Sequence, residues 1–593
     1  MELVFDKFDY QGELPRTLKE GEVYSVRMVD ESNDVKDVPL FIRKHLVQQE
    51  DTFRKFLAGE NVTPSKKVRR KLYVTGPPGC GKTVFTTMIA HRYAAGATAT
   101  TPTQNKRALM ILFRELAACQ IFIIHGQETE KLRKKVFQKN IVKIVEELLE
   151  DQGIPSFDLC ILDGVRQSLG ECTSLIQVLN AYTGEAERIN KVVFTTSLQF
   201  DLRGGDMPLG SNRGHEEINF DSFAQDDYLD AVVNKTFLGR LLAAQPDIMD
   251  GILHWKREGK PKLQREEEKK SDADTDVSVD AFLADDNNVA ATLDYVNHHY
   301  YYAGGSARFM FEYTTFELKE LLGKWFDKIQ KDEWDAFASS TLSPRASIAV
   351  NSLMQQFNGV TTAVSKYVLF KAYSKVEGRL VEALRAAAEK FENPLLRGWA
   401  FELQQLHTIK TVLENNSLDG SREKSLKSKE GLCFQPVKNG EASFDGNKLS
   451  KSHGVELNCG TIIWCMKWNQ GCFDVAFFTK NTLLTLQFTV AGVHSLKVHY
   501  INALKNAIEN SGGLKIKTCI HVGVVGGDDN TLNAFNFLDP EGAGRRAWNL
   551  DFTLRTYKAS ELMAVDGEEQ EHLEATHLGD KEVYTNKRAV DAE

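Results

Sequence analysis

The stretch Leu72-Tyr-Val-Thr-Gly-Pro-Pro-Gly-Cys-Gly-Lys-Thr83 decides the fold of this chain of 593 residues. Its last eight residues match the phosphate-binding loop pattern G-x-x-x-x-G-K-[ST] in full. An apolar run precedes the loop, and Val84-Phe-Thr-Thr-Met-Ile-Ala90 follows it with helical character. Because the motif needs the order strand, glycine-rich loop, helix, the sequence predicts a site for a nucleoside triphosphate, ATP or GTP, with Mg²⁺.

Each part of the loop has an expected role at this site. The glycines let backbone N–H groups turn toward the phosphates, and the helix N-terminus adds a partial positive charge. The lysine is expected on the β- and γ-phosphates, and the threonine on the metal ion. The nucleotide-binding residues of the loop are therefore Gly76, Pro77, Pro78, Gly79, Cys80, Gly81, Lys82 and Thr83.

Alternating strands and helices around the loop predict an α/β fold with a parallel sheet covered by helices on both faces. The expected strands are 71–75, 120–125, 157–162 and 191–197. Apolar spacing predicts one amphipathic helix over 129–151. Further helices are expected over 315–330, 346–358, 362–390 and 395–412, and a late one over 494–508.

A second element of a P-loop NTPase follows the loop after about 80 residues. Phe157-Asp-Leu-Cys-Ile-Leu-Asp163 is an apolar strand that ends in an aspartate, the Walker B form, so Asp163 is expected to hold Mg²⁺ opposite Thr83. The other interpretation is a buried strand that ends in a turn aspartate. Gly164 stands where many P-loop ATPases have a glutamate that polarises water, which predicts slow hydrolysis or another carboxylate.

Two further segments are candidates for contact with the nucleotide. Lys191-Val-Val-Phe-Thr-Thr-Ser197 is a strand that ends in hydroxyl residues, which either sense the γ-phosphate or cap a turn. In AAA-like ATPases an arginine of a Gly-Gly-x-x-Arg turn points from a helical lid at the nucleotide, and Gly304-Gly-Ser-Ala-Arg308 has this form. The alternative for Arg308 is an arginine that lies in solvent after a glycine turn.

The carboxyl-terminal part carries a second group of candidate residues. Glu402 lies on a predicted helix, Asp474 on an apolar strand, and Gln487 on the next strand. This layout is the one of restriction-endonuclease-like nucleases, in which carboxylates such as Asp474 bind Mg²⁺ beside the scissile phosphate. Thr489 stands where that layout has a lysine, and Lys497, on the following helix, is the candidate replacement. The alternative is a site that binds DNA without cleaving it.

The domain organisation follows from these motifs. We expect an N-terminal region, a P-loop NTPase core, a flexible linker, a helical lid, a helical connector, an α/β restriction-endonuclease-like domain and an acidic tail. Their expected ranges are 1–65, 66–257, 258–288, 289–345, 346–394, 395–540 and 541–593.

Taken together, these motifs resemble the Crinkler effectors of oomycetes and other eukaryotes, which are related to retrotransposon-hot-spot proteins. The resemblance covers roughly residues 65–525 and rests on the P-loop, on Tyr302-Ala-Gly-Gly-Ser-Ala-Arg308, and on Asp474 with Gln487-Phe-Thr489 and His494-Ser-Leu-Lys497. It implies an NTPase module joined to a metal-dependent nuclease that acts as an effector on DNA in a host nucleus, where it damages DNA and causes cell death. The ubiquitin-like header typical of the family is not evident.

Composition limits the partners. The net charge of −9 gives no global basic signature, so DNA binding needs a local patch such as Lys66-Lys-Val-Arg-Arg-Lys71, which also resembles a nuclear import signal.

No run of 18 apolar residues predicts a membrane span, and Met1-Glu-Leu-Val-Phe-Asp6 lacks the character of a signal peptide. The expected partners are DNA and host nuclear proteins, with self-association left open.

Three functions remain open from the sequence alone. The first is an NTP-powered nuclease. The second is a nucleotide-switched module that binds DNA or protein without cleavage. The third is a kinase-type phosphotransferase, which is the weakest because no acceptor pocket is recognisable.

Overall fold

The computed structural model of the chain consists of two compact units, residues 1–371 and 372–593. The residues that it describes are 5–9, 17–29, 35–59, 71–96, 106–113, 118–125, 128–132, 136–151, 154–165, 170–184, 188–196, 215–258, 277–330, 333–334, 348–357, 360–376, 378–391, 394–418, 425–427, 433–434, 441–444, 449–451, 462–465, 473–478, 481–490, 493–495, 498–512, 515–526, 536–538, 551–558 and 563–565. Each unit is considered by itself.

The first unit is built on a nine-stranded sheet, in which eight strands follow the order β1-β7-β6-β5-β9-β10-β4-β11 and β8 pairs with β6. Its parallel part contains β5 (Arg107–Phe113), β9 (Phe157–Val165), β10 (Ile189–Thr196), β4 (Lys71–Thr75) and β11 (His215–Asn219). The antiparallel strands β6 (Ala118–His125), β7 (Glu128–Leu132), β8 (Val136–Phe137) and β1 (Phe5–Asp9) extend one edge. The strand that bears the P-loop is thus separated from the Walker B strand by β10.

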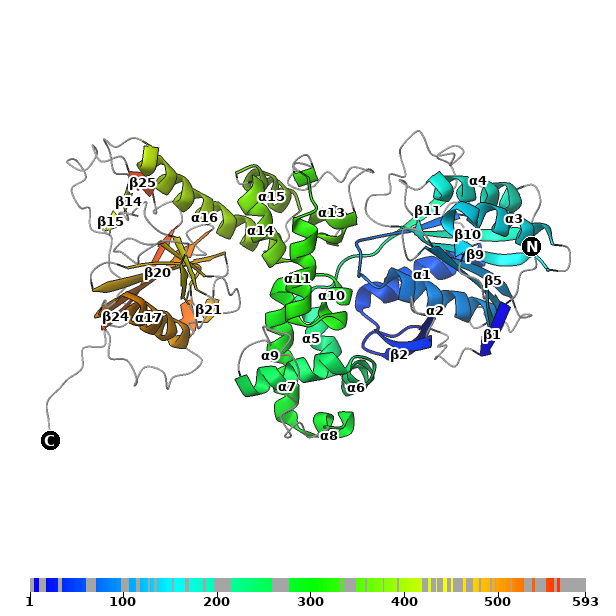
Figure 1. Ribbon diagram of the computed structural model, residues 1–593, viewed down its shortest axis with the longest axis horizontal. Helices are drawn as coiled ribbons and strands as arrows, with labels where there is room; N and C mark the ends of the chain where they lie inside the picture. The colour runs from blue at the N-terminus through cyan, green and yellow to red at the C-terminus, as the bar shows by residue number, and fades with distance from the viewer. Residues whose placement is uncertain are drawn as a thin grey trace. The chain divides into compact units, whose positions relative to one another are not determined.

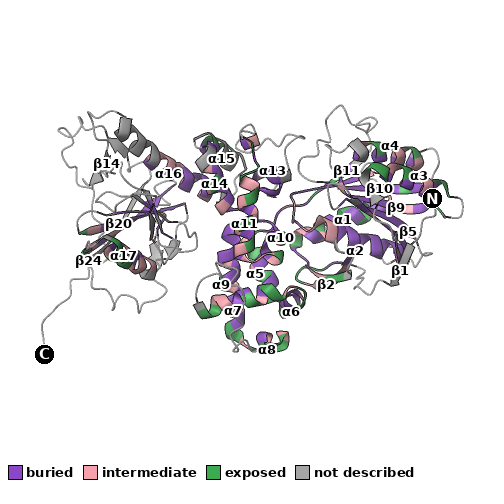
Figure 2. Cartoon of the chain, in the orientation of Figure 1, coloured by how far each residue is buried: buried purple, intermediate pink, exposed green. Residues whose placement is uncertain are grey.

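Helices cover both faces of this sheet (Figure 1). One face packs against α1 (Lys44–Ala58), α2 (Lys82–Ala94) and the hairpin β2–β3 (Val23–Val29, Val35–Phe41). The other face packs against α3 (Ile141–Glu150) and α4 (Gly170–Gly184). Figure 2 shows the consequence, because the central strands and α2 are buried on all sides. The predicted α/β sheet with two helical layers is therefore present in this unit.

The prediction of a single helix over 129–151 is wrong. Residues Glu128–Leu132 form β7, which pairs with β6 and β1, and the helix begins only at Ile141. Sheet pairing with two neighbours outweighs the weak helical preference of this charged segment. Thr129, 1% exposed, points into the core from β7.

A helical block follows the sheet in the first unit. It contains α5 (Gln225–Val233), α6 (Lys235–Ala244), α7 (Pro246–Glu258), α8 (Val279–Ala284), α9 (Asp286–Ala303), α10 (Ala307–Glu312) and α11 (Thr315–Phe326). Part of the expected linker 258–288 belongs to α8 and the start of α9, because Ser278 and Asp285 cap these two helices. Residues 259–276 lie outside the described part of the chain.

The predictions of helices over 346–358 and 362–390 are also wrong in part. Helix α13 (Ile348–Ser352) is short and is followed by a hairpin of β12 (Met354–Phe357) and β13 (Val360–Ala363). Helices α14 (Lys366–Val376) and α15 (Gly378–Phe391) come next. The hairpin forms because its strands pair with each other and bond to Ser222 and Gly305, which provides partners that an isolated helix lacks.

The second unit contains a mixed sheet of seven strands in the order β17-β16-β18-β19-β20-β22-β24. The strands are β16 (Glu441–Phe444), β17 (Leu449–Lys451), β18 (Ile462–Cys465), β19 (Val475–Phe478), β20 (Thr482–Thr489), β22 (Thr518–Val525) and β24 (Asp551–Lys558). Helices α16 (Pro394–Leu418) and α17 (Val498–Gly512) accompany it, and α17 supplies Ile501, Leu504 and Ile508 to the core. Small sheets form from β14 (Ser425–Lys427), β15 (Cys433–Phe434) and β25 (Met563–Val565), and from β21 (Val493–Ser495) and β23 (Asn536–Leu538).

None of the helices in the described part of the chain is long and apolar enough to cross a membrane.

Candidate functional site

The P-loop lies between β4 and α2, and its backbone is shaped by three glycines. Gly76, Gly79 and Gly81 have φ values of 151°, 77° and 91°, which side-chain-bearing residues rarely adopt. Gly76 could carry no side chain for a second reason, because a Cβ there would lie 2.6 Å from the carbonyl oxygen of Phe220. Gly81 is the N-cap of α2. The backbone N–H groups of the loop therefore lie at the N-terminus of this helix, which carries a partial positive charge.

The ammonium group of Lys82 is folded back onto the loop. Its Nζ donates hydrogen bonds to the carbonyl oxygens of Gly76 at 2.8 Å and Pro77 at 2.7 Å, and lies 3.5 Å from Sγ of Cys80. The positive charge is thereby held inside the curve of the loop. Phosphate oxygens that entered this curve would compete with the two carbonyls as stronger, charged acceptors.

Thr83 and Asp163 meet across the carboxyl edge of the sheet. Thr83 Oγ1 donates a 2.7 Å hydrogen bond to Oδ2 of Asp163, whose side chain is almost fully buried. A hydroxyl and a carboxylate are hard oxygen ligands of the kind that Mg²⁺ takes when it is shared with phosphate oxygens. The two predicted metal ligands are therefore brought together by α2 and β9.

Strand β10 lies between the P-loop strand and the Walker B strand, and the hydroxyl groups of Thr195 and Thr196 at its end have different surroundings. Thr195 pairs in register with Val74 on one side and Asp163 on the other. Thr196 Oγ1 donates to the carbonyl oxygen of Val165 at 2.9 Å, so it caps the end of the neighbouring strand. Thr195 Oγ1 is buried and has no hydrogen-bond partner among the described residues, which makes it the hydroxyl available to a ligand.

The backbone explains why Gly164 is not a glutamate. Its φ is 81°, and a Cβ at this position would lie 2.5 Å from the carbonyl oxygen of Phe113 on β5. A side chain after Asp163 would therefore be both strained and blocked. A carboxylate that polarises water cannot come from this position.

The turn Gly304-Gly-Ser-Ala-Arg308 lies directly on the P-loop. The N–H of Ala307 donates to the carbonyl oxygen of Gly79 at 2.9 Å. A Cβ on Gly79 would be 2.0 Å from Oγ of Ser306, so the two backbones approach as closely as a glycine allows. Ser306 was not predicted from the sequence, although its place inside the Gly-Gly-x-x-Arg pattern and just before a helix would have suggested an N-cap.

The Cβ atom of Arg308 lies beside Gly79 of the P-loop, but its guanidinium group pairs with Glu312. Its Cβ lies 3.3 Å from the position that a Cβ on Gly79 would take. Its Nε forms an ion pair of 3.4 Å with Glu312, one turn further along α10, and both side chains are about half exposed. Such an exposed pair contributes little stability, on the order of 0–1 kcal/mol, so exchanging it for a phosphate contact is inexpensive.

In the second unit, Asp474 and Gln487 are neighbours on adjacent strands. Val475 pairs with Leu486, and extending this antiparallel register by one residue places Asp474 opposite Gln487. Alternation along both strands puts the two side chains on the face that bears Ala476 and Leu483, the face packed against α17. The two residues that the sequence groups into one candidate site are therefore neighbours in the sheet.

The carboxylate of Asp474 also has a structural role. Oδ2 accepts a 2.7 Å hydrogen bond from the N–H of Phe488, while the N–H of Asp474 donates to the carbonyl oxygen of Leu486. The side chain thereby continues the hydrogen-bond ladder past the first residue of β19. This contact accounts for an aspartate beside an apolar strand without requiring a metal ion.

The remaining nuclease candidates lie on α16, which packs against β20, and beyond the described residues. Glu402 is buried on α16, and Lys497 lies outside the described residues. In the described part of the chain, no group of three or more His, Cys, Asp or Glu residues is placed to hold a metal ion. The same face of the sheet does contain a buried hydrogen bond between Thr485 Oγ1 and His521 Nδ1, at 2.8 Å, which the sequence analysis missed.

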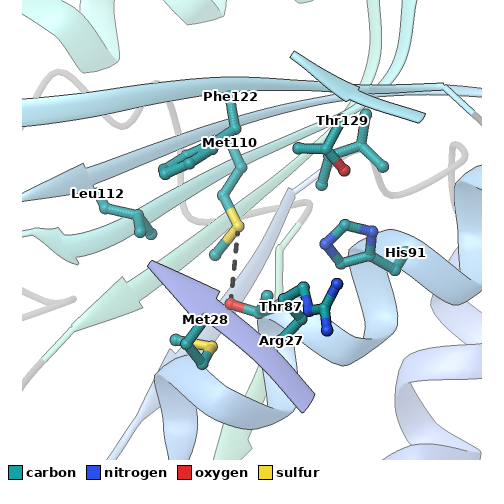
Figure 3. Close-up of a pocket in the computed structure, with 9 residues that line it drawn as sticks. Arg27, Met28, Thr87, His91, Met110, Leu112, Phe122 and Thr129 are labelled. Carbon is teal, nitrogen blue, oxygen red and sulfur yellow. Dashed lines mark hydrogen bonds between the residues drawn. The ribbon is translucent and has the colours of Figure 1, made fainter. Parts of the chain in front are cut away.

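A cavity of about 20 Å³ lies between β2, α2 and the sheet, and it is distinct from the P-loop (Figure 3). It is lined by Met28, Met110 and Thr129 together with Thr87 and His91 of α2. Burial lowers the pKa of His91 to about 3, so this imidazole is neutral. A space of this size holds about one water molecule, which excludes it as a nucleotide site.

Comparisons with known proteins assign no family. No family model and no curated protein matches the chain. Among solved structures it is similar to PCH-2 of C. elegans, with a TM-score of 0.21 and 13% identity. The similarity covers 38% of this chain and 55% of the PCH-2 chain, so it spans little more than half of that protein. Because the TM-score is so low, the site has to be judged on its own geometry.

Proposed function

We propose that the chain is a Mg²⁺-dependent nucleoside triphosphatase whose P-loop is closed by a helical lid. The observation that carries the proposal is the contact of Gly79 with Ser306 and Ala307, which places the lid turn on the phosphate-binding loop. Lys82, Thr83 and Asp163 supply the cation and the metal ligands beside it. A P-loop that served only to stabilise the fold would not need another glycine-rich turn in contact with it.

The residues at the site suit triphosphate chemistry at a modest rate. Bound Mg²⁺ would neutralise charge on the β- and γ-phosphates. Thr83 and Asp163 would hold the metal, Lys82 would bind phosphate oxygens, and Thr195 offers a buried hydroxyl beside Asp163. Since Gly164 leaves no carboxylate at the usual place, slow turnover is expected.

The test is nucleotide binding and phosphate release with fluorescent ATP and GTP analogues in the presence of Mg²⁺. Lys82→Ala should weaken binding at least tenfold and abolish phosphate release. Lys143→Ala is the matched control, because this lysine is exposed on α3 and should change neither quantity. Equal binding by the wild type and Lys82→Ala would reject the proposal.

A second candidate function is a metal-dependent nuclease in the carboxyl-terminal unit. The proximity of Asp474 and Gln487 on one sheet face favours it. DNA in a host nucleus, membership of the Crinkler effectors and contact with host nuclear proteins belong to this proposal. The basic cluster that would serve nuclear import lies outside the described residues except for Lys71. Mg²⁺-dependent nicking of plasmid DNA tests it, and DNA binding without nicking would favour the nucleotide-switched binding module.

A further inference from the structure

The hairpin of β12 and β13 holds the lid turn that lies on the P-loop. The N–H of Gly305 donates to two acceptors of the hairpin segment, the carbonyl oxygen of Val364 at 3.0 Å and Oε1 of Gln355 at 3.1 Å. Gln355 is fully buried. A Cβ on Gly305 would lie 2.4 Å from Gln355 Oε1, so the turn and the hairpin are in direct contact.

The same hairpin holds the segment by which the chain enters the lid. Ser222, between β11 and α5, donates its N–H to the carbonyl oxygen of Gln356 at 2.8 Å, and its Oγ accepts from the N–H of Gln356 at 3.2 Å. The N–H of Phe223 donates to the carbonyl oxygen of Gly305 at 3.0 Å. The lid entry and the lid turn are therefore tied to each other and to one strand.

From the hairpin the chain runs directly into α14. Ser365 caps this helix by accepting a hydrogen bond from the N–H of Val368 at 3.3 Å. In its first turn, Tyr367 packs against Tyr302 and Tyr301 of α9, with ring centroids 5.1 and 6.0 Å apart. Because the boundary between the two units falls after Lys371, inside α14, this helix is the covalent path out of the first unit.

We propose that the β12–β13 hairpin transmits the nucleotide state of the P-loop to α14, with Gln355 as the positioning residue. This inference rests on the proposed function. A phosphate in the loop changes the position of Gly79, and the hydrogen bond from Ala307 passes the change to Gly305. Gln355 and Val364 convey it to the first turn of α14. The path consists of the hydrogen bond from Ala307 to Gly79, two steps along the backbone to Gly305, and the buried hydrogen bonds of Gly305 with Val364 and Gln355.

The experiment measures amide hydrogen exchange of residues 366–376 with and without Mg²⁺-nucleotide. It compares the wild-type chain with Gln355→Met, which removes the side-chain acceptor of Gly305, leaves the carbonyl oxygen of Val364 as the other acceptor and keeps the side-chain length. Gln356→Met is the matched control, since only the backbone of Gln356 bonds to Ser222, and its Oε1 has no hydrogen-bond partner among the described residues.

Nucleotide should slow exchange of α14 severalfold in the wild type and in Gln356→Met. In Gln355→Met this nucleotide-dependent change should be lost, and nucleotide affinity should fall about tenfold, which corresponds to about 1.4 kcal/mol. If Gln355→Met does not fold, Ser222→Ala takes its place and should weaken the same change.

The outcomes separate the inference from the function on which it rests. A wild-type chain that binds nucleotide without any change in α14 overturns the hairpin's role and leaves the NTPase intact. Full retention of the change in Gln355→Met overturns it as well. A wild-type chain that binds no nucleotide overturns both.

Discussion

The hydroxyl of Thr83 lies 2.7 Å from Oδ2 of Asp163, although the two residues are 80 positions apart in the chain. Thr83 lies in the first turn of α2 and Asp163 near the end of β9, and β10 separates β9 from the P-loop strand. Their meeting depends on the sheet order as much as on the two motifs. Asp163, only 5% exposed, is therefore poised as an acceptor that a metal ion could share.

Asp163→Asn should separate metal binding from folding. The amide is of the same size and its oxygen still accepts the hydrogen bond from Thr83, so the thermal midpoint should change little. The loss of the negative charge should abolish the Mg²⁺-dependent part of nucleotide affinity. Nucleotide titrations with and without EDTA measure the Mg²⁺-dependent part of the affinity. A variant whose binding still strengthens with Mg²⁺ as in the wild type would show that Asp163 is not a metal ligand.

Gly164→Glu should destabilise the protein and should not accelerate hydrolysis. The substitution forces a side chain into a φ of 81° and within 2.5 Å of the Phe113 carbonyl oxygen. We expect a loss of unfolding free energy of about 2–4 kcal/mol, from strain and steric conflict together. Urea unfolding measures it. Gly323→Ala is the control, since this helical position has open space and should gain about 0.5–1 kcal/mol.

Gly79→Ala should disrupt the contact between the P-loop and the lid. The new methyl group would lie 2.0 Å from Oγ of Ser306, and the φ of 77° adds strain. Nucleotide binding should weaken strongly, and the double variant Gly79→Ala with Ser306→Gly should recover part of it. Gly81→Ala has the strain without a close neighbour and separates the two effects. Independent, additive losses in the double-mutant cycle would contradict a direct contact.

The local motifs of the first unit could be predicted because each is contiguous in sequence. The P-loop, the Walker B strand and the Gly-Gly-x-x-Arg turn each carry their own signature, and the structure brings them to one edge of the sheet. What the sequence did not show is how the lid turn is held there. Ser306 and Gln355 act through contacts with segments far away in the chain, and single residues give no periodic signal of such contacts.

The hairpin that contains Gln355 did leave a signal that the helical interpretation overlooked. Asn358-Gly359 stands between Met354-Gln-Gln-Phe357 and Val360-Thr-Thr-Ala363. An Asn-Gly pair between two short strands is the strongest short-range indication of a two-residue hairpin turn. The prediction of helices over 346–358 and 362–390 did not take this pair into account.

The stability of the first unit should fall in mild acid because of His299. This side chain is fully buried between Thr315 Oγ1 and the carbonyl oxygen of Phe309, and burial lowers its pKa from 6.5 to about 4. Because the unfolded chain takes up the proton at higher pH, the contribution of His299 is fully present above about pH 6.5. It is lost as the pH falls toward about 4, with a total of about 3 kcal/mol.

Urea unfolding at several pH values between 7.5 and 4 measures this loss. His299→Gln should lower stability at pH 7.5 and flatten the pH dependence, since the titrating group is gone. His125→Gln is the control at an exposed position and should leave the slope unchanged. A His299→Gln variant with the full wild-type slope would assign the acid sensitivity to another buried group, such as His91.

Asp474 needs two substitutions to separate its structural role from a catalytic one. Asp474→Ala removes the acceptor of the Phe488 N–H, so it should destabilise the second unit by about 1–3 kcal/mol whether or not the unit is a nuclease. A loss of plasmid nicking in Asp474→Ala could therefore come from the loss of stability and would not identify Asp474 as a catalytic residue. Asp474→Asn keeps an oxygen that can accept the same hydrogen bond and removes the charge that would bind Mg²⁺. If the unit is a nuclease, Asp474→Asn should unfold at nearly the wild-type urea concentration and show no Mg²⁺-dependent nicking. Nicking that persists in this folded variant would remove Asp474 from the catalytic site and leave it as the residue that extends the pairing of β19 with β20.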